Sequence, residues 1–213
     1  MKLVKHTHAT VALERDGHTL LIDPGAFTPD AAELIRAAEA VLLTHDHFDH
    51  FDENAVRAGL VDDDRLHVYG PASVTRPLGE FGDRVHTVAG GEVLSIKGFE
   101  VKVYGVPHAT IHQCIPGVDN VGYLVDGTVL HPGDAYLVPD VPVDTLLIPT
   151  SGPWTKMGEA IDYVRAVRPR QCVQIHDIML STIGKTSADM FLGARSLTGT
   201  PLLSPAVGES ITV

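Results

Sequence analysis

A short segment in the first quarter of the chain is dense in side chains that bind metal ions. Residues 44–50 read Thr-His-Asp-His-Phe-Asp-His, with three histidines and two aspartates. Neutral imidazole is the commonest metal ligand of proteins, and carboxylates bind the same divalent ions. His45, His47, Asp49 and His50 cannot all face one way on a helix or a strand. On a tight turn they can, or they can divide between two adjacent ions, so the segment predicts a metal site in a loop.

The element in front of this segment supports that interpretation. Residues 40–44, Ala-Val-Leu-Leu-Thr, form an apolar run typical of a strand that is buried on both faces. A loop at the end of such a strand holds functional side chains on a rigid support. The alternative is a solvated polar loop, but the density of ligating side chains favours a functional site.

Taken with the rest of the chain, the segment resembles the signature motif of the metallo-β-lactamase-fold hydrolase superfamily. The other motifs of that superfamily follow in order: an early strand ending in Asp23, residues 105–108 ending in a lone histidine, residues 130–134 with Gly-Asp, and residues 174–176 ending in histidine. The resemblance spans residues 20–176. It implies an α+β fold, a four-layer αββα sandwich, and the activity of a metal-dependent hydrolase.

The resemblance also implies a ligand set for two divalent ions, most simply Zn²⁺, with Mn²⁺, Fe²⁺ or Ni²⁺ as alternatives. The first ion would be bound by His45, His47 and His108, and the second by Asp49, His50 and His176, with Asp134 bridging both. Asp23 would hold a ligand histidine by its other ring nitrogen, as metal sites commonly require. His112 is a rival to His108. For His131, a supporting role at the site and a purely structural role remain equal alternatives.

The chemistry implied by this site is hydrolysis by a hydroxide that bridges the two ions. The expected substrate is a small molecule with a lactone, ester or amide bond. Asp49 is the catalytic candidate, because it could orient the hydroxide or carry its proton. Trp154, in a Gly-Pro loop after the apolar residues 145–148, is a candidate wall of the substrate cleft, although a tryptophan in such a loop is more often a half-buried packing residue. The alternatives are a phosphodiesterase of the same fold and a metal-binding regulatory module without turnover.

Within the superfamily, the chain resembles most the short branch related to ascorbate-6-phosphate lactonase. That branch opens with a segment similar to residues 6–11, where His8 matches the histidine of the branch and Thr7 replaces a glycine. On a strand, His6 and His8 share a face. The side chain of His8 would then point toward the metal pocket, beside the ligands, and a solvated edge strand is an equal alternative.

The elements that must position these residues alternate between strands and helices, without a linker or a composition break, so a single domain over residues 1–213 is expected. The expected strands are 11–14, 19–23, 40–44, 66–69, 92–96, 99–104, 121–125, 128–131, 145–148 and 171–175. The expected helices are 30–38, 53–58, 71–81, 157–167 and 187–197. Strands in this number, with the helices segregated from them, favour two sheets packed face to face with helices outside.

Charge and hydropathy narrow the partners further. Lysine and arginine number 16 against 27 aspartate and glutamate, so the formal net charge is −11. That sign repels nucleic acid and anionic membrane surfaces, and neither is an expected partner. No apolar run approaches the ~18 residues of a membrane span, and residues 1–6 lack the apolar region of a signal peptide. A cytoplasmic location is expected, and the sequence carries no indication of an oligomeric state.

Overall fold

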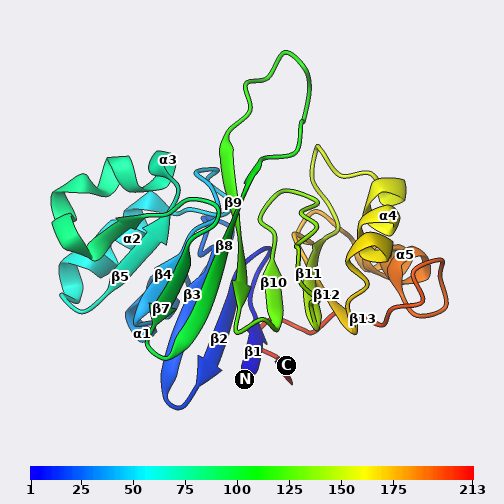
Figure 1. Cartoon of the computed structure of the whole chain (residues 1–213), viewed down its shortest axis with the longest axis horizontal. Coiled ribbons are helices and arrows are strands. Elements are labelled where there is room, and N and C mark those ends of the chain that lie inside the picture. The colour runs from blue at the N-terminus through cyan, green and yellow to red at the C-terminus, as the bar shows by residue number, and fades with distance from the viewer.

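Two seven-stranded sheets pack face to face in the computed structural model, which describes all 213 residues (Figure 1). The first sheet has the strand order β14 (Ser210–Thr212), β1 (Lys2–Lys5), β2 (Val11–Arg15), β3 (His18–Ile22), β4 (Ala40–Leu42), β5 (His67–Gly70) and β6 (Val85–Thr87). The second sheet has the order β13 (Leu202–Leu203), β12 (Gln171–Ile175), β11 (Thr145–Pro149), β10 (Val129–His131), β9 (Asp119–Val125), β8 (Phe99–Pro107) and β7 (Val93–Ile96).

Helices cover the outer face of each sheet (Figure 1). The first sheet carries α1 (Ala31–Ala37), α2 (Glu53–Asp62) and α3 (Ala72–Thr75), which continues as a 3₁₀ helix over Arg76–Arg84. The second sheet carries α4 (Met157–Val167) and α5 (Thr182–Leu192). This arrangement confirms the predicted α+β fold with four αββα layers.

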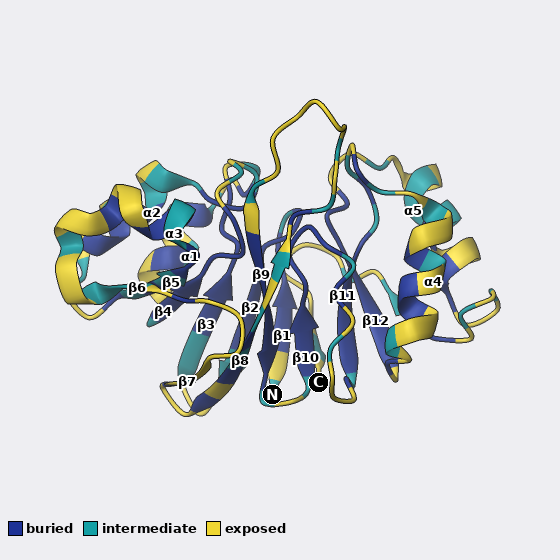
Figure 2. Ribbon diagram, turned by 45° about the horizontal axis from the view of Figure 1, so that its top comes forward, coloured by how far each residue is buried: buried dark blue, intermediate teal, exposed yellow.

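The alternation of side chains along the strands creates three apolar layers. Leu20 and Ile22 point into the core between the two sheets, whereas Leu21 packs outward against the helices of the first sheet. In the second sheet, Tyr123 faces the central core and Leu124 faces the layer under α4 and α5. Figure 2 shows the result, with buried strands in the middle and exposed outer surfaces on the helices. Each helix thus lies over one sheet and away from the other.

Strand direction explains why the sequence motifs meet. Strands β3, β4, β5 and β6 run parallel, so their carboxyl ends lie at one edge of the first sheet. Strands β10, β11 and β12 are also parallel to one another. Asp23, His45, Asp134 and His176 all stand just beyond the ends of these strands. The loops that hold them can therefore converge between the two sheets.

Three predicted helices differ clearly from the structure. The helix predicted over 53–58 continues to Asp62 as α2. The last helix is α5, Thr182–Leu192, and the predicted range 187–197 is wrong by five residues at each end. The side chain of Ser181 caps it by accepting a hydrogen bond from the Gly184 amide, and the chain leaves the helix at Gly193. The predicted helix 71–81 is α-helical only in α3, because Pro77 lacks the amide that would continue the α-helical hydrogen bonding.

None of the helices combines the length and the apolar character that crossing a bilayer requires.

Candidate metal centre

Three histidines form the first cluster of donor atoms. His45 and His47 lie in the loop after β4, and His108 directly follows β8. One ring nitrogen of each lies within 4.8 Å of the others. His45 and His108 are buried, whereas His47 is half-buried and faces the open side. The structure therefore brings together the three residues predicted for the first ion.

Four residues form the second cluster, His8, Asp49, His50 and His176. Asp49 Oδ2 lies 3.4 Å from His176 Nε2, 3.9 Å from His50 Nε2 and 3.1 Å from His8 Nε2. Asp49 and His50 belong to the loop after β4, and His176 directly follows β12 in the other sheet. The predicted set for the second ion is thus assembled, with His8 as an additional member.

Asp134 lies between the two clusters. Its Oδ2 is 3.4 Å from His108 Nε2 in the first cluster and 3.1 Å from His176 Nε2 in the second. Its Oδ1 is 3.1 Å from His50 Nε2. A carboxylate at this position contacts both groups of donors, as the predicted bridging role requires.

Hydrogen bonds behind the histidines select which ring nitrogen faces the centre. Asp23 Oδ2 accepts a bond from His50 Nδ1 at 2.6 Å and one from the Thr44 hydroxyl at 2.7 Å. Because the hydroxyl of Thr44 donates to Asp23, it accepts from His45 Nδ1, at 2.9 Å. His108 Nδ1 donates to the carbonyl of Ala109 at 2.6 Å. Asp23 therefore has the supporting position that the sequence predicts.

The nitrogens turned toward the centre have no hydrogen-bond partner. They are Nε2 of His45, His50, His108 and His176, and all are buried, as is the unpartnered Oδ1 of Asp134. Buried polar atoms are almost always hydrogen-bonded, so several unpartnered acceptors in one place require an explanation. Divalent cations provide it, because a neutral imidazole that is protonated at Nδ1 offers its Nε2 lone pair to a metal. The donor set thus fits metal ions.

The electrostatics of the centre favour ionised carboxylates. Burial raises the pKa of Asp134, but the charge of His50 and the close approach of His108 and His176 outweigh it and hold that pKa well below its usual range. The pKa of Asp49 is also lowered, because its contacts with His176 and His8 outweigh the effect of burial. Burial lowers the pKa of His45 well below its usual range, helped by the charge of His50. Despite burial, Asp134 and Asp23 raise the pKa of His50 well above its usual range, so in the absence of metal a proton occupies the place that a cation would take. The centre therefore combines ionised carboxylates with imidazole nitrogens, a combination that binds cations.

Unusual backbone conformations bring several side chains to the centre. His8, Asp23 and His176 have φ angles of 59°, 52° and 52°, in the left-handed region that few residues other than glycine adopt. Gly25 meets the metal-binding loop so closely that an added Cβ would lie 1.9 Å from the carbonyl oxygen of Asp49. Such constraints concentrate at functional sites.

His8 reaches the centre by a route that differs from the prediction. It lies in a turn after β1 and not on a strand, so the shared face with His6 does not place it. Its ring centroid is 3.9 Å from that of His176. Below the turn, the buried ammonium group of Lys5 donates to the His6 and His8 carbonyls and lies 3.4 Å from Asp177 Oδ1. Nothing in the sequence around Lys5 indicates this role.

Trp154 occupies a different place from the predicted cleft wall. It is 4% exposed, and its indole Nε1 donates a 2.7 Å hydrogen bond to Asp134 Oδ2. His131 is structural, because its Nε2 donates to the Ala9 carbonyl and its Nδ1 accepts from the Gly133 amide. His112 is exposed and belongs to neither cluster, which leaves His108 as the donor.

Comparisons with known proteins show the family to which the chain belongs. Residues 2–176 match the family model described as Beta-lactamase superfamily domain. Protein Rv0786c of Mycobacterium tuberculosis is 36% identical over 186 residues, which cover 85% of this chain and 86% of that protein. A UPF0173 metal-dependent hydrolase of Pyrobaculum arsenaticum is 31% identical over 195 residues, which cover 83% of this chain and 84% of its own.

The fold of this chain is also similar to that of a solved structure over nearly its whole length. Igni18, described as a novel metallo hydrolase from the archaeon Ignicoccus hospitalis, superposes with a TM-score of 0.74 at 17% identity. The match covers 99% of this chain and 97% of that one. At this identity the likeness concerns the fold alone, and it includes both sheets and their helices.

Proposed function

This chain belongs to the beta-lactamase superfamily domain family and is a metal-dependent hydrolase, and we propose that it cleaves a lactone, ester or amide bond in a small substrate with two divalent ions. The observation that carries this proposal is the position of Asp134. A buried carboxylate in contact with both donor clusters is the feature that two neighbouring ions require and that one closed structural ion does not.

The proposed ligands are divided as the two clusters suggest. His45, His47 and His108 would hold one ion, and Asp49, His50 and His176 the other, with Asp134 shared. Nitrogen and oxygen donors with open positions suit Zn²⁺, and also Mn²⁺, Fe²⁺ or Ni²⁺. Two ions bound there would supply Lewis acidity to a carbonyl and lower the pKa of a water between them toward ~7.

The residues of the chain would supply orientation and proton transfer. Asp49 Oδ2 is engaged by His8 and His176, so its Oδ1 would orient the attacking water and take up its proton. Asp23 would keep His50 in the tautomer that presents Nε2. A thiol nucleophile is not needed, and Cys172 could not be one, because burial raises its pKa to about 12.

The charges around the centre favour a carboxylic ester, lactone or amide over a phosphodiester. A cavity of about 60 Å³ opens beside His47 and His108, and no lysine or arginine lines it. On the side of the second cluster, Lys5 and Lys185 are both engaged by Asp177. A phosphodiesterase would be expected to present a free cation to the anionic substrate.

The test combines metal counting with substrate comparison. Purified protein loaded with Zn²⁺ or Mn²⁺ should contain about two ions per chain and should hydrolyse lactones, carboxylic esters or amides faster than a phosphodiester. A matched control is Asp140→Ala, which removes an exposed carboxylate outside the centre. One tightly held ion without turnover would favour a regulatory module, and preference for the phosphodiester would overturn the proposed substrate class.

A further inference from the structure

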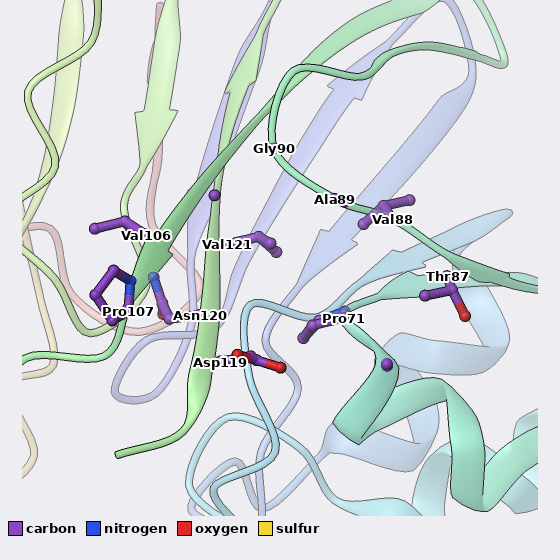
Figure 3. A pocket seen from close by; sticks show the side chains of 12 residues that line it. Pro71, Thr87, Val88, Ala89, Gly90, Val106, Pro107, Asp119, Asn120 and Val121 are labelled. Atoms are coloured by element: carbon purple, nitrogen blue, oxygen red, sulfur yellow. The ribbon is translucent and has the colours of Figure 1, made fainter.

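A larger cleft lies beside the candidate metal centre. It has a volume of about 450 Å³, within the range of small-molecule sites. Its lining comes from the loop after β5, the segment after β6, the end of β8 and the beginning of β9 (Figure 3). At one side the chain backbones touch, because a Cβ on Gly90 would lie 2.3 Å from the Gly105 nitrogen.

The lining of the cleft adjoins the first cluster along the chain and Asp134 through a hydrogen bond. Its lining ends at Pro107, and the next residue in the chain is His108. On the β9 side it contains Asn120, which is buried and whose Oδ1 accepts a 3.0 Å hydrogen bond from the Asp134 amide. A substrate whose reacting bond lies at the donor clusters would therefore have this cleft beside it on one side.

The lining side chains are mainly apolar and include no cation. The apolar ones are Pro71, Ala72, Val88, Ala89, Val106, Pro107 and Val121. The only charged residue among the lining is the exposed Asp119, whose side chain extends toward the Pro71 side (Figure 3). Such a surface gains free energy from burying hydrocarbon and repels a carboxylate or a phosphate.

We propose that this cleft binds an uncharged apolar group next to the bond that is hydrolysed, so that the substrate is an ester, lactone or amide with a hydrocarbon side. The inference rests on the proposed hydrolysis at the donor clusters and adds the class of the neighbouring group. Each methylene that enters the cleft should raise kcat/KM about fourfold, until the cleft is filled.

The first experiment measures kcat/KM for two series of uncharged esters, one with the acyl chain lengthened from two to eight carbons and one with the alcohol chain lengthened. One series should rise with length. Ala89→Phe fills the cleft and should remove most of that rise. Ala37→Phe, an exposed position on α1, is the matched control and should keep the rise. A flat response in both series would overturn the proposal.

The second experiment tests whether the cleft disfavours a charged substrate chain. Esters whose chain ends in a carboxylate should be poorer substrates than uncharged esters of the same length. Asp119→Lys should narrow this difference by roughly tenfold, whereas Asp119→Asn should narrow it less. A wild-type preference for the anionic chain would contradict the proposed class of substrate.

Measurements of ligand binding can test the cleft assignment even if the proposed hydrolysis is wrong. Alkyl hydroxamates bind divalent ions without being hydrolysed, so their affinity for metal-loaded protein can be measured by calorimetry even when no ester is turned over. Octanohydroxamate should bind at least roughly tenfold more tightly than acetohydroxamate, and Ala89→Phe should abolish the difference. Equal affinities would overturn the cleft assignment, whereas a chain-length effect without any ester, lactone or amide hydrolysis would contradict only the proposed reaction.

Discussion

The two donor clusters of the metal centre differ in how firmly their side chains are held. In the first cluster, His47 is half-buried, and no hydrogen bond positions its ring. In the second, His50 is fully buried and bonded to Asp23, and His8 and His176 both contact Asp49. One cluster is therefore open on one side, and the other is enclosed.

This difference indicates a division of roles. An enclosed set of donors is preorganised, so the second cluster should retain its ion more strongly. The first cluster has its open side beside the small cavity at His47 and lies next to the apolar cleft, so it should meet the substrate. Substitutions in one cluster, in the other, or in the residues between them should therefore have different effects.

The largest effect is expected where both clusters depend on one residue. Asp134→Ala removes the carboxylate between them, so turnover should be abolished and neither ion should survive dialysis. His45→Ala should also abolish turnover, but part of the metal should remain in the second cluster. Elemental analysis with circular dichroism as a check on folding measures both. A folded Asp134→Ala protein that keeps two ions would show that this residue does not bridge.

A smaller and one-sided effect is expected for Asp23→Asn. The variant weakens the hydrogen bond that orients His50, so metal affinity at the second cluster should fall by roughly 10–100-fold while the first cluster changes little. Competition with a chromogenic chelator resolves the two affinities. Asp16→Asn is the control, because Asp16 has the same φ angle of 52° in an exposed turn. Equal losses at both clusters would contradict the division between them.

Trp154→Phe should lower metal affinity by a still smaller amount, and by a similar amount at both clusters. The variant removes the donor to Asp134 Oδ2, and a hydrogen bond to a charged group contributes about 1.5–3 kcal/mol. We expect an apo protein of lower stability and metal affinity reduced by roughly tenfold at both clusters. Tyr136→Phe, in the aromatic layer that packs on Trp154, should leave affinity unchanged.

The same residue provides a direct signal. Trp154 is the only tryptophan in the chain, so intrinsic fluorescence excited at the indole reports the surroundings of Asp134. Metal titration of the wild-type protein should change the emission in step with binding. An emission that is insensitive to metal would argue against the proximity of Asp134 to the bound ions.

Much of the fold and of the donor set could be predicted from sequence, because both depend on residues that lie close together in the chain. The apolar strands alternate or run continuously, and His45 to His50 lie within one loop. Asp134 and His176 each follow an apolar strand, so their convergence follows once the strands are parallel. The helix over 157–167 was predicted with its observed bounds, because its apolar positions repeat with helical spacing before Pro169.

The features that differ from the sequence-based predictions depend on contacts between residues that are distant in the chain. His8 is held by a left-handed turn and by Lys5, and neither leaves a local pattern. Trp154 is turned away from solvent by its bond to Asp134, which lies 20 residues away in the chain. The helix at 187–197 was misplaced because apolar residues such as Met190, Phe191 and Leu197 suggest a later helix, whereas Ser181 fixes an earlier start.

The smallest effect is expected for Lys5→Met, and it concerns the second cluster alone. Lys5 is fully buried, and desolvation lowers its pKa despite the opposing attraction of Asp177. Replacing a buried cation with an apolar side chain of similar length often changes stability little, so the free energy of unfolding should stay within about 2 kcal/mol. What the variant loses is the fixation of the His8 turn.

The chelator competition should therefore show a few-fold lower metal affinity at the second cluster and an unchanged affinity at the first. Thermal unfolding should show a nearly unchanged melting temperature. Lys2→Met, on the same strand but exposed and paired only with Glu14, is the matched control and should change neither affinity. A loss of stability without a change at the second cluster would make Lys5 a purely structural residue. It would also remove the His8 turn from the features that distinguish the enclosed cluster from the open one.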